Sequence, residues 1–183
     1  MWDYYAVLFI YTLIMKPIEF VKKYLPYARK VENQTGMSAI ASLAQCAVET
    51  GWGKTVVGNM MFGVKDSDGI NGNEQLLTTT EYLKTPNAKF PVVISVSKYG
   101  SNLWKYIVKD YFRKYASPAD SFFDHAALIS SRPIYKKAWN NRNNYVLFLD
   151  EVAKAGYATG PEYAKVCIQV GKMIEKIILE NKL

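Results

Sequence analysis

The sequence predicts an α+β fold that is mostly helical, with a small antiparallel β-lobe in the middle of the chain. Apolar residues recur at three- and four-residue spacing over residues 18–31 and 40–48, the pattern of helices that pack on a core. Over residues 75–115 the composition shifts toward Thr, Val, Ile and Tyr, which favour strands. A chain of 183 residues, half of them hydrophobic, suits one domain with a substantial core.

Two helices are expected before the β region. Pro17 suits the first turn of a helix, and the stripe that follows it ends near Gly36. Ser38 is a good N-cap for a second helix over residues 38–50, because its hydroxyl can accept from a free backbone N–H group. Gly51 can adopt the positive φ that ends this helix. Residues 51–73 hold six glycines and are predicted to form loops.

The second half of the chain starts with the β region and returns to helix. Residues 76–83 and 92–96 are predicted to be strands, whereas the apolar pattern over 102–115 fits either a strand or a helix. Ser117, Pro118 and Asp120 form a strong helix start, with a capping hydroxyl, a proline at N1 and an acid at N3. Four helices are then expected, at about 118–130, 133–140, 143–155 and 161–180.

Residues 1–16 form an apolar leader, and we assign residues 17–183 to the domain. The apolar run is about a dozen residues, short of the ~20 that span a bilayer, so no stable membrane span is expected. Asp3 stands where a signal peptide carries Lys or Arg, and no small-residue cleavage site follows. Three interpretations stay open: an interfacial or partner-binding segment, an atypical export signal, or an artefact of an upstream start codon. We favour the artefact, with Met15 as the natural beginning.

Charge and cysteine content narrow the chemistry. The formal charge of +7 favours polyanionic surroundings, either nucleic acid or a bacterial wall rich in carboxylates and phosphate polymers. The basic residues are dispersed without a recognition motif, so we do not expect nucleic-acid binding. Cys46 and Cys167 lie in apolar stretches and are expected to be free thiols in the core. With His125 as the single histidine, neither a zinc site nor a Ser-His triad is expected, and no cofactor. Acid–base chemistry by carboxylates remains.

Glu49 is the strongest candidate for that chemistry. It falls in the last turn of an apolar helix, where the helix dipole is negative and does not stabilise a carboxylate. Apolar neighbours add a desolvation cost, so both effects push its pKa upward. A carboxyl group that stays protonated near neutral pH is what a general acid requires. The alternative, a solvated glutamate at a helix end, stays open on position alone.

Five motifs in order strengthen the catalytic interpretation. They are Ala44-Gln45-Cys46-Ala47-Val48-Glu49-Thr50-Gly51-Trp52-Gly53, Asn59-Met60-Met61-Phe62-Gly63-Val64-Lys65, Thr79-Thr80-Glu81-Tyr82, Phe112-Arg113-Lys114-Tyr115-Ala116-Ser117 and Gly156-Tyr157-Ala158-Thr159-Gly160-Pro161-Glu162-Tyr163. Together they resemble the glucosaminidases of glycoside hydrolase family 73, which include autolysins, phage-borne lysins and flagellum-associated peptidoglycan hydrolases. The resemblance covers about residues 18–178.

This resemblance implies a lysozyme-like fold, a strand over residues 102–115 and a set of site residues. It implies that Glu49 is the general acid and that Glu81, on the β-lobe, is the second catalytic glutamate. A strand-surface charge remains the alternative for Glu81. The resemblance places Tyr157 at the catalytic cleft and implies substrate contacts from Asn59, Phe62 and Tyr82. Gly160 stands where the family usually has Asp, and Trp52 is expected to brace the turn by packing.

The leading hypothesis is an endo-β-N-acetylglucosaminidase that cleaves the β-1,4 bond on the reducing side of GlcNAc in peptidoglycan glycan strands. A muramidase or lytic transglycosylase of the same broad fold is the alternative, and a non-catalytic wall-binding protein is a third. The resemblance implies a monomer that acts at the bacterial cell wall, in the periplasm or outside the cell. The export route and the choice between host autolysin and phage lysin stay open.

Overall fold

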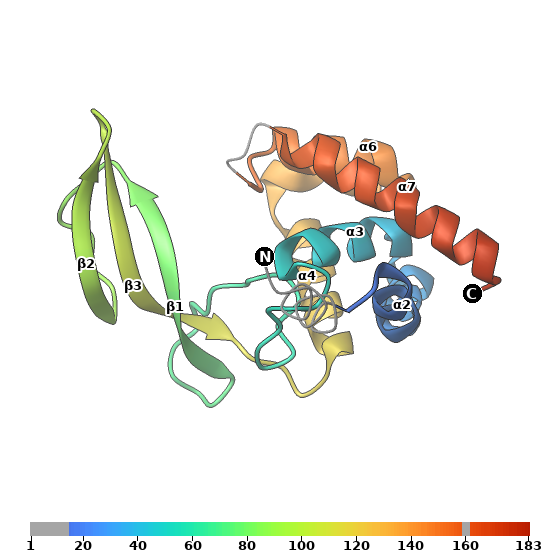
Figure 1. The fold of residues 1–183 in the computed structure, drawn as a ribbon, viewed down its shortest axis with the longest axis horizontal. Helices are drawn as coiled ribbons and strands as arrows, with labels where there is room; N and C mark the ends of the chain where they lie inside the picture. Colours follow the sequence, from blue (N-terminus) through green and yellow to red (C-terminus); the bar gives the residue numbers. More distant parts are fainter. Residues whose placement is uncertain (1–14, 159–161) are drawn as a thin grey trace, which may run out of the picture. The chain divides into compact units, whose positions relative to one another are not determined.

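The computed structural model describes residues 15–158 and 162–183, which form two compact units (Figure 1). The helical unit holds the described residues up to Phe62 and those from Ala116 onward, and the β unit spans Gly63–Tyr115. The predicted α+β, mostly helical fold with an antiparallel sheet is therefore confirmed. The leader, apart from its last two residues, lies outside the described part of the chain, as do Gly160 and the expected helix start at 161.

Helix ends follow the capping signals in the sequence. Helix α2 (Pro17–Thr35) starts at its proline and ends at Gly36, with φ 75°. Helix α4 (Pro118–Ser131) begins with a capping box in which Ser117 and Asp120 bond each other's backbone N–H groups. The other helices are α3 (Ala39–Thr50), α5 (Lys136–Asn140), α6 (Tyr145–Lys154) and α7 (Tyr163–Asn181). The single helix expected over 133–140 is instead a 3-10 turn, η1 (Pro133–Tyr135), followed by α5.

Helix α3 is the central element of the helical unit. It packs against α2, α6 and α7, and almost all of its side chains are buried. A helix that is apolar nearly all round belongs in a core, and burying each large side chain contributes about 1.5–3 kcal/mol. Both cysteines are buried free thiols, as predicted. The C-terminal end of α3, where Val48 and Glu49 emerge, is the part that solvent reaches.

The β unit is a three-stranded antiparallel sheet with the order β1-β3-β2 (Figure 1). Its strands are β1 (Glu74–Leu83), β2 (Val92–Tyr99) and β3 (Leu103–Arg113). The segment that fitted either a helix or a strand is thus the middle strand. Its alternate residues Tyr106 and Val108 are buried, as expected for a strand with one face toward a core. It forms backbone pairs with β1 on one side and β2 on the other.

One face of this sheet is covered by a chain segment of the β unit, and the other is not covered by that segment. Residues directly opposite each other share a face, so Glu81, Tyr106 and Val96 lie on one face, while Tyr82, Lys105 and Ser97 lie on the other. The segment 84–91 covers the first: the Tyr106 hydroxyl donates to the Thr85 carbonyl (2.6 Å) and accepts from the Ala88 N–H (3.2 Å). We call the face with Tyr106 the covered face and the face with Tyr82 the open face.

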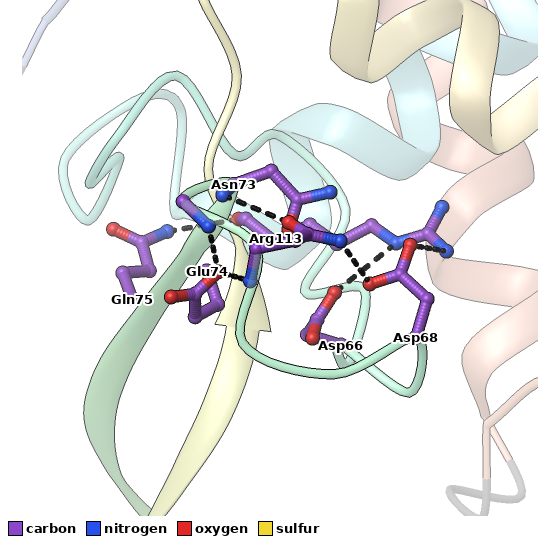
Figure 2. A network of polar contacts seen from close by, with 8 residues as sticks. Asp66, Asp68, Asn73, Glu74, Gln75 and Arg113 are labelled. Carbon is purple, nitrogen blue, oxygen red and sulfur yellow. Dashed lines mark hydrogen bonds and ion pairs between the residues drawn. The ribbon is translucent and has the colours of Figure 1, made fainter.

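The loop that precedes β1 is fixed by polar contacts (Figure 2). The Arg113 guanidinium lies 3.7 Å from the Asp66 carboxylate and 3.6 Å from that of Asp68. The Glu74 carboxylate accepts from the backbone N–H groups of Asn71 (3.1 Å) and Gly72 (2.8 Å). Arg113 thus supplies the positive charge between two loop carboxylates and holds the loop against the end of β3.

In residues 15–158 and 162–183, no helix is long and apolar enough to cross a bilayer. Within the same ranges, no group of three or more His, Cys, Asp or Glu side chains is arranged to hold a metal ion.

Candidate active site

Glu49 lies at the end of α3 and contacts the first residue of α7. Gly51 ends α3 with φ 57°, as the sequence predicts, which leaves Glu49 in the last turn. The Tyr163 hydroxyl donates to Glu49 Oε1 (3.2 Å) and accepts from Gln45 Nε2 (3.1 Å). Gln45 is fully buried one helical turn before Glu49. A polar chain therefore runs from the core of the helical unit to the carboxyl group.

The surroundings of Glu49 favour its protonated form. Burial raises the pKa of Glu49 above its ordinary value, and the hydrogen bond from Tyr163 partly opposes this shift. The residue is still open to solvent on one side, so protons and substrate can reach it. The predicted direction of the shift is thus confirmed, with desolvation as its main cause.

Tyr163 and Gln45 are site residues that sequence reasoning missed. Burial, followed by the proximity of Tyr157 and Glu49, raises the pKa of Tyr163, so its hydroxyl keeps its proton and remains a donor. Gln45 gave one usable signal, because a glutamine four residues before Glu49 on an apolar helix shares its face. Tyr163 closes the last of the five motifs, but no local pattern predicts its contact with Glu49, which spans 114 residues of sequence.

Tyr157 and Phe62 join the same region through aromatic packing. The Tyr157 ring lies 5.9 Å from that of Tyr163 and 5.7 Å, edge-on, from the imidazole of His125. On its other side, His125 stacks on Phe62 with 4.0 Å between ring centroids. Phe62 is only 4% exposed, so it has little surface to offer a ligand. Its direct contact with a sugar stays a prediction, and its observed role is to support His125.

Asn59 and Trp52 belong to the loops that follow α3. Asn59 has φ 55°, and its side-chain amide donates to the Ala116 carbonyl (3.2 Å). This bond joins the loop after α3 to the segment that precedes α4. Trp52 packs edge-on against Phe20, 5.4 Å between centroids, in agreement with the expected bracing role. A contact between Asn59 and an N-acetyl group remains a prediction.

In the β unit, Glu81 is paired with a lysine. Lys65 Nζ lies 2.8 Å from Glu81 Oε1 and 2.9 Å from Asp110 Oδ2, on the covered face of the sheet. Burial alone would lower the pKa of Lys65, but hydrogen bonds and charge from the two carboxylates outweigh it and raise that pKa. Glu81 is half-buried, so it is neither a freely solvated surface charge nor a core residue.

Tyr82 lies on the open face, away from Glu81. Its ring is 46% exposed and contacts the ring of Tyr99, 4.8 Å between centroids. Consecutive residues of a strand point to opposite faces, so Tyr82 and Glu81 present their side chains to different sides of the sheet. The predicted substrate contact of Tyr82 therefore belongs to a different surface from that of Glu81.

We expect Tyr163→Phe to raise the pKa of Glu49 further, because it removes the hydrogen bond that favours the ionised form. The alkaline limb of the pH–activity profile should move to higher pH. The matched control is Tyr145→Phe, which removes a similar hydrogen bond to Glu175 (3.1 Å) elsewhere in the helical unit. An unchanged limb in Tyr163→Phe, or an equal shift in the control, would contradict the assigned contact.

His125 provides a test of stability against pH. Burial lowers the pKa of His125 from 6.5 to about 3, and among the described residues neither ring nitrogen has a hydrogen-bond partner. Below pH 6.5 His125 becomes protonated in the unfolded chain but stays neutral in the folded chain. The free energy of unfolding should therefore fall by up to ~1.4 kcal/mol per pH unit as the pH is lowered to about 3. His125→Phe removes this proton and should flatten the acid-side decline. Urea unfolding between pH 4 and 8 measures both slopes, and equal slopes would contradict the argument.

The fold and this geometry define a class of protein. A mostly helical domain with a small antiparallel β-lobe carries, at the end of a core helix, a glutamate whose pKa is raised, and this is the fold of a solved glycoside hydrolase domain that is 26% identical to the chain. The chain belongs to the glucosaminidase family, because the family model described as mannosyl-glycoprotein endo-beta-N-acetylglucosaminidase matches residues 25–177.

Individual relatives agree with the family. The chain is 30% identical over 164 residues to the peptidoglycan hydrolase FlgJ of Pseudomonas aeruginosa and 31% identical over 166 residues to that of Vibrio cholerae. These matches take in 86% and 87% of the chain but only 36% and 44% of the relatives. The chain therefore spans less than half the length of the curated relatives it matches.

Solved structures show the same fold. The glycoside hydrolase domain of FlgJ from Salmonella typhimurium, C-terminally truncated, matches with a TM-score of 0.66 and 26% identity, covering 88% of this chain and 99% of that one. A peptidoglycan hydrolase mutant from Sphingomonas sp. A1 matches with a TM-score of 0.68 and 24% identity, over 89% and 99% of the two chains. The lysozyme-like expectation is confirmed.

Proposed function

We propose that this protein hydrolyses peptidoglycan glycan strands at the β-1,4 bond on the reducing side of GlcNAc, with Glu49 as general acid. The observation that carries the proposal is the raised pKa of Glu49, held at the end of a buried helix by contact with Tyr163. The family match and the names of the relatives, peptidoglycan hydrolases and an autolysin of Enterococcus faecalis, support the substrate class.

In this mechanism Glu49 protonates the departing glycosidic oxygen. The same contacts serve both of its protonation states, because a tyrosine hydroxyl can donate and accept. When Glu49 is ionised, the Tyr163 hydroxyl donates to it and accepts from Gln45, which is the arrangement observed. When Glu49 is protonated, it can donate to Tyr163. The carboxyl group stays oriented as its charge changes.

Glu81 is proposed as the second catalytic group. Glycoside hydrolysis needs either a base that activates water or a group that supports the positively charged transition state. The 2.8 Å ion pair with Lys65 orients the Glu81 carboxylate, which suits either role. Tyr157 is proposed to orient the sugar or the water through its hydroxyl. We expect neither a metal nor another cofactor to take part, and we expect the protein to act at the cell wall as a monomer.

The test is the identity of the sugars at the new chain ends. Isolated sacculi are digested with the purified protein, reduced with borohydride and analysed by mass spectrometry. The proposal predicts reduced GlcNAc ends. Reduced MurNAc ends would indicate a muramidase, anhydro-MurNAc ends a lytic transglycosylase, and the absence of solubilised fragments a non-catalytic wall-binding protein.

A further inference from the structure

We propose that the open face of the sheet is a second binding surface, for the anionic glycan strands of the cell wall, on the opposite side of the sheet from Glu81. The open face consists of the alternate side chains of the three strands that share the side of Tyr82. The inference rests on the proposed function for the identity of the polymer, and on the structure of the β unit for the surface itself.

An exposed pair of tyrosines is the first observation. Tyr82 and Tyr99 are 46% and 54% exposed, and their ring centroids lie 4.8 Å apart at an interplanar angle of 57°. They belong to the two outer strands, so their rings meet over β3. This contact independently places both on one face. A pair of exposed phenol rings offers apolar surface with polar edges, which suits the C–H faces and hydroxyls of sugar rings.

Lysines and hydroxyl groups surround the pair, whereas Glu74, the carboxylate that the strand register places on this face, stands at the far end of β1 opposite Arg113. Three cross-strand rows make up this part of the open face: Tyr82–Lys105–Ser97, Thr80–Ile107–Ser95 and Thr78–Lys109–Val92. The two lysines stand in the middle strand, where they can face a ligand that crosses the sheet. Peptidoglycan carries carboxylates on its peptide stems, and wall polymers add phosphates. The charge of the face is therefore complementary to the wall.

The edge strand β2 leaves its part of the open face uncovered. All eight residues of β2 are exposed, and Val92 is the apolar residue that the strand register places on the open face. A second copy placed face to face on the open face would bring Lys105 and Lys109 against their own counterparts, which disfavours it. An anionic polysaccharide has no such conflict.

The experiment measures sedimentation with isolated sacculi, using the full chain with Glu49→Gln so that the wall is not digested. We expect Tyr99→Thr to weaken binding by about tenfold and Lys105→Gln by about fivefold at low salt. Lys98→Gln is the matched control, because Lys98 lies on the covered face of the same edge strand and should leave binding unchanged. Colloidal chitin, a neutral GlcNAc polymer, separates the two contributions: Tyr99→Thr should weaken binding to it and Lys105→Gln should not.

The outcomes are separable from those of the proposed function. If Tyr99→Thr and Lys105→Gln bind sacculi as tightly as the parent while retaining its melting temperature, the open face is not a glycan surface, even if the unmutated protein digests walls. A concentration-dependent dimer in solution that Tyr99→Thr abolishes would also overturn the proposal, because the face would then be a self-association surface. Failure to hydrolyse sacculi would reject the proposed function and leave the binding result readable.

Discussion

Glu49→Gln should lower wall hydrolysis by at least ~100-fold, the lower range for general acid catalysis. Glutamine keeps the size of the side chain and can still accept from the Tyr163 hydroxyl, but it has no proton to give to the glycosidic oxygen. The melting temperature should barely change, because Glu49 is partly open to solvent and its one observed side-chain bond survives. Release of soluble fragments from labelled sacculi measures the rate.

Glu175→Gln is the matched control for this prediction. Glu175 also accepts from a tyrosine hydroxyl, that of Tyr145 at 3.1 Å, on α7 of the same unit. It should retain full activity. A purified, folded Glu49→Gln protein that digests walls at the parent rate would remove Glu49 from the mechanism.

Glu81→Gln should lower turnover by about 100-fold or more while binding of the glycan persists, because a base or a cation-stabilising group acts mainly in the transition state. Steady-state kinetics on soluble peptidoglycan fragments separate kcat from KM. Tyr157→Phe should cost less, since it removes one hydroxyl and keeps the ring that packs on Tyr163 and His125.

Asp110→Asn controls for the ion pair of Glu81. It removes the negative charge from the second contact of Lys65, at 2.9 Å, and leaves Glu81 and its own contact with Lys65 at 2.8 Å in place. If Asp110→Asn lowers turnover as much as Glu81→Gln does, then turnover depends on the charge balance around Lys65 and not on the Glu81 carboxylate itself. If Tyr157→Phe is more damaging than Glu81→Gln, the proposed division of roles is wrong.

Local signals predicted the helices and the electrostatics of Glu49. Ser38, Gly51 and the Ser117–Asp120 box act within one turn, so the sequence alone locates the helix ends. The raised pKa of Glu49 also follows from local facts, a helix end among apolar residues. The strand over 102–115 could be predicted only with the family resemblance, because its apolar spacing fits both a helix and a strand. Pairing with β1 and β2 is what makes this segment a strand.

The remaining features depend on contacts that sequence spacing does not encode. The bond from Tyr163 to Glu49 and the ion pair from Lys65 to Glu81 join separate elements, and neither was anticipated. The placement of Tyr82 and Glu81 on opposite faces is different, because the alternation of side chains along a strand already implies it. Phe62 was expected to contact substrate, and the structure shows it stacked beneath His125.

The most direct measurement of the central claim is the titration of the Glu49 carboxyl carbon by NMR, with the signal assigned by its absence in Glu49→Gln. We expect the pKa of Glu49 to lie above the ordinary value of 4.5, and the alkaline limb of the hydrolysis profile to follow the same titration. A Glu49 that titrates at or below 4.5, with an alkaline limb set by another group, would contradict its role as the general acid.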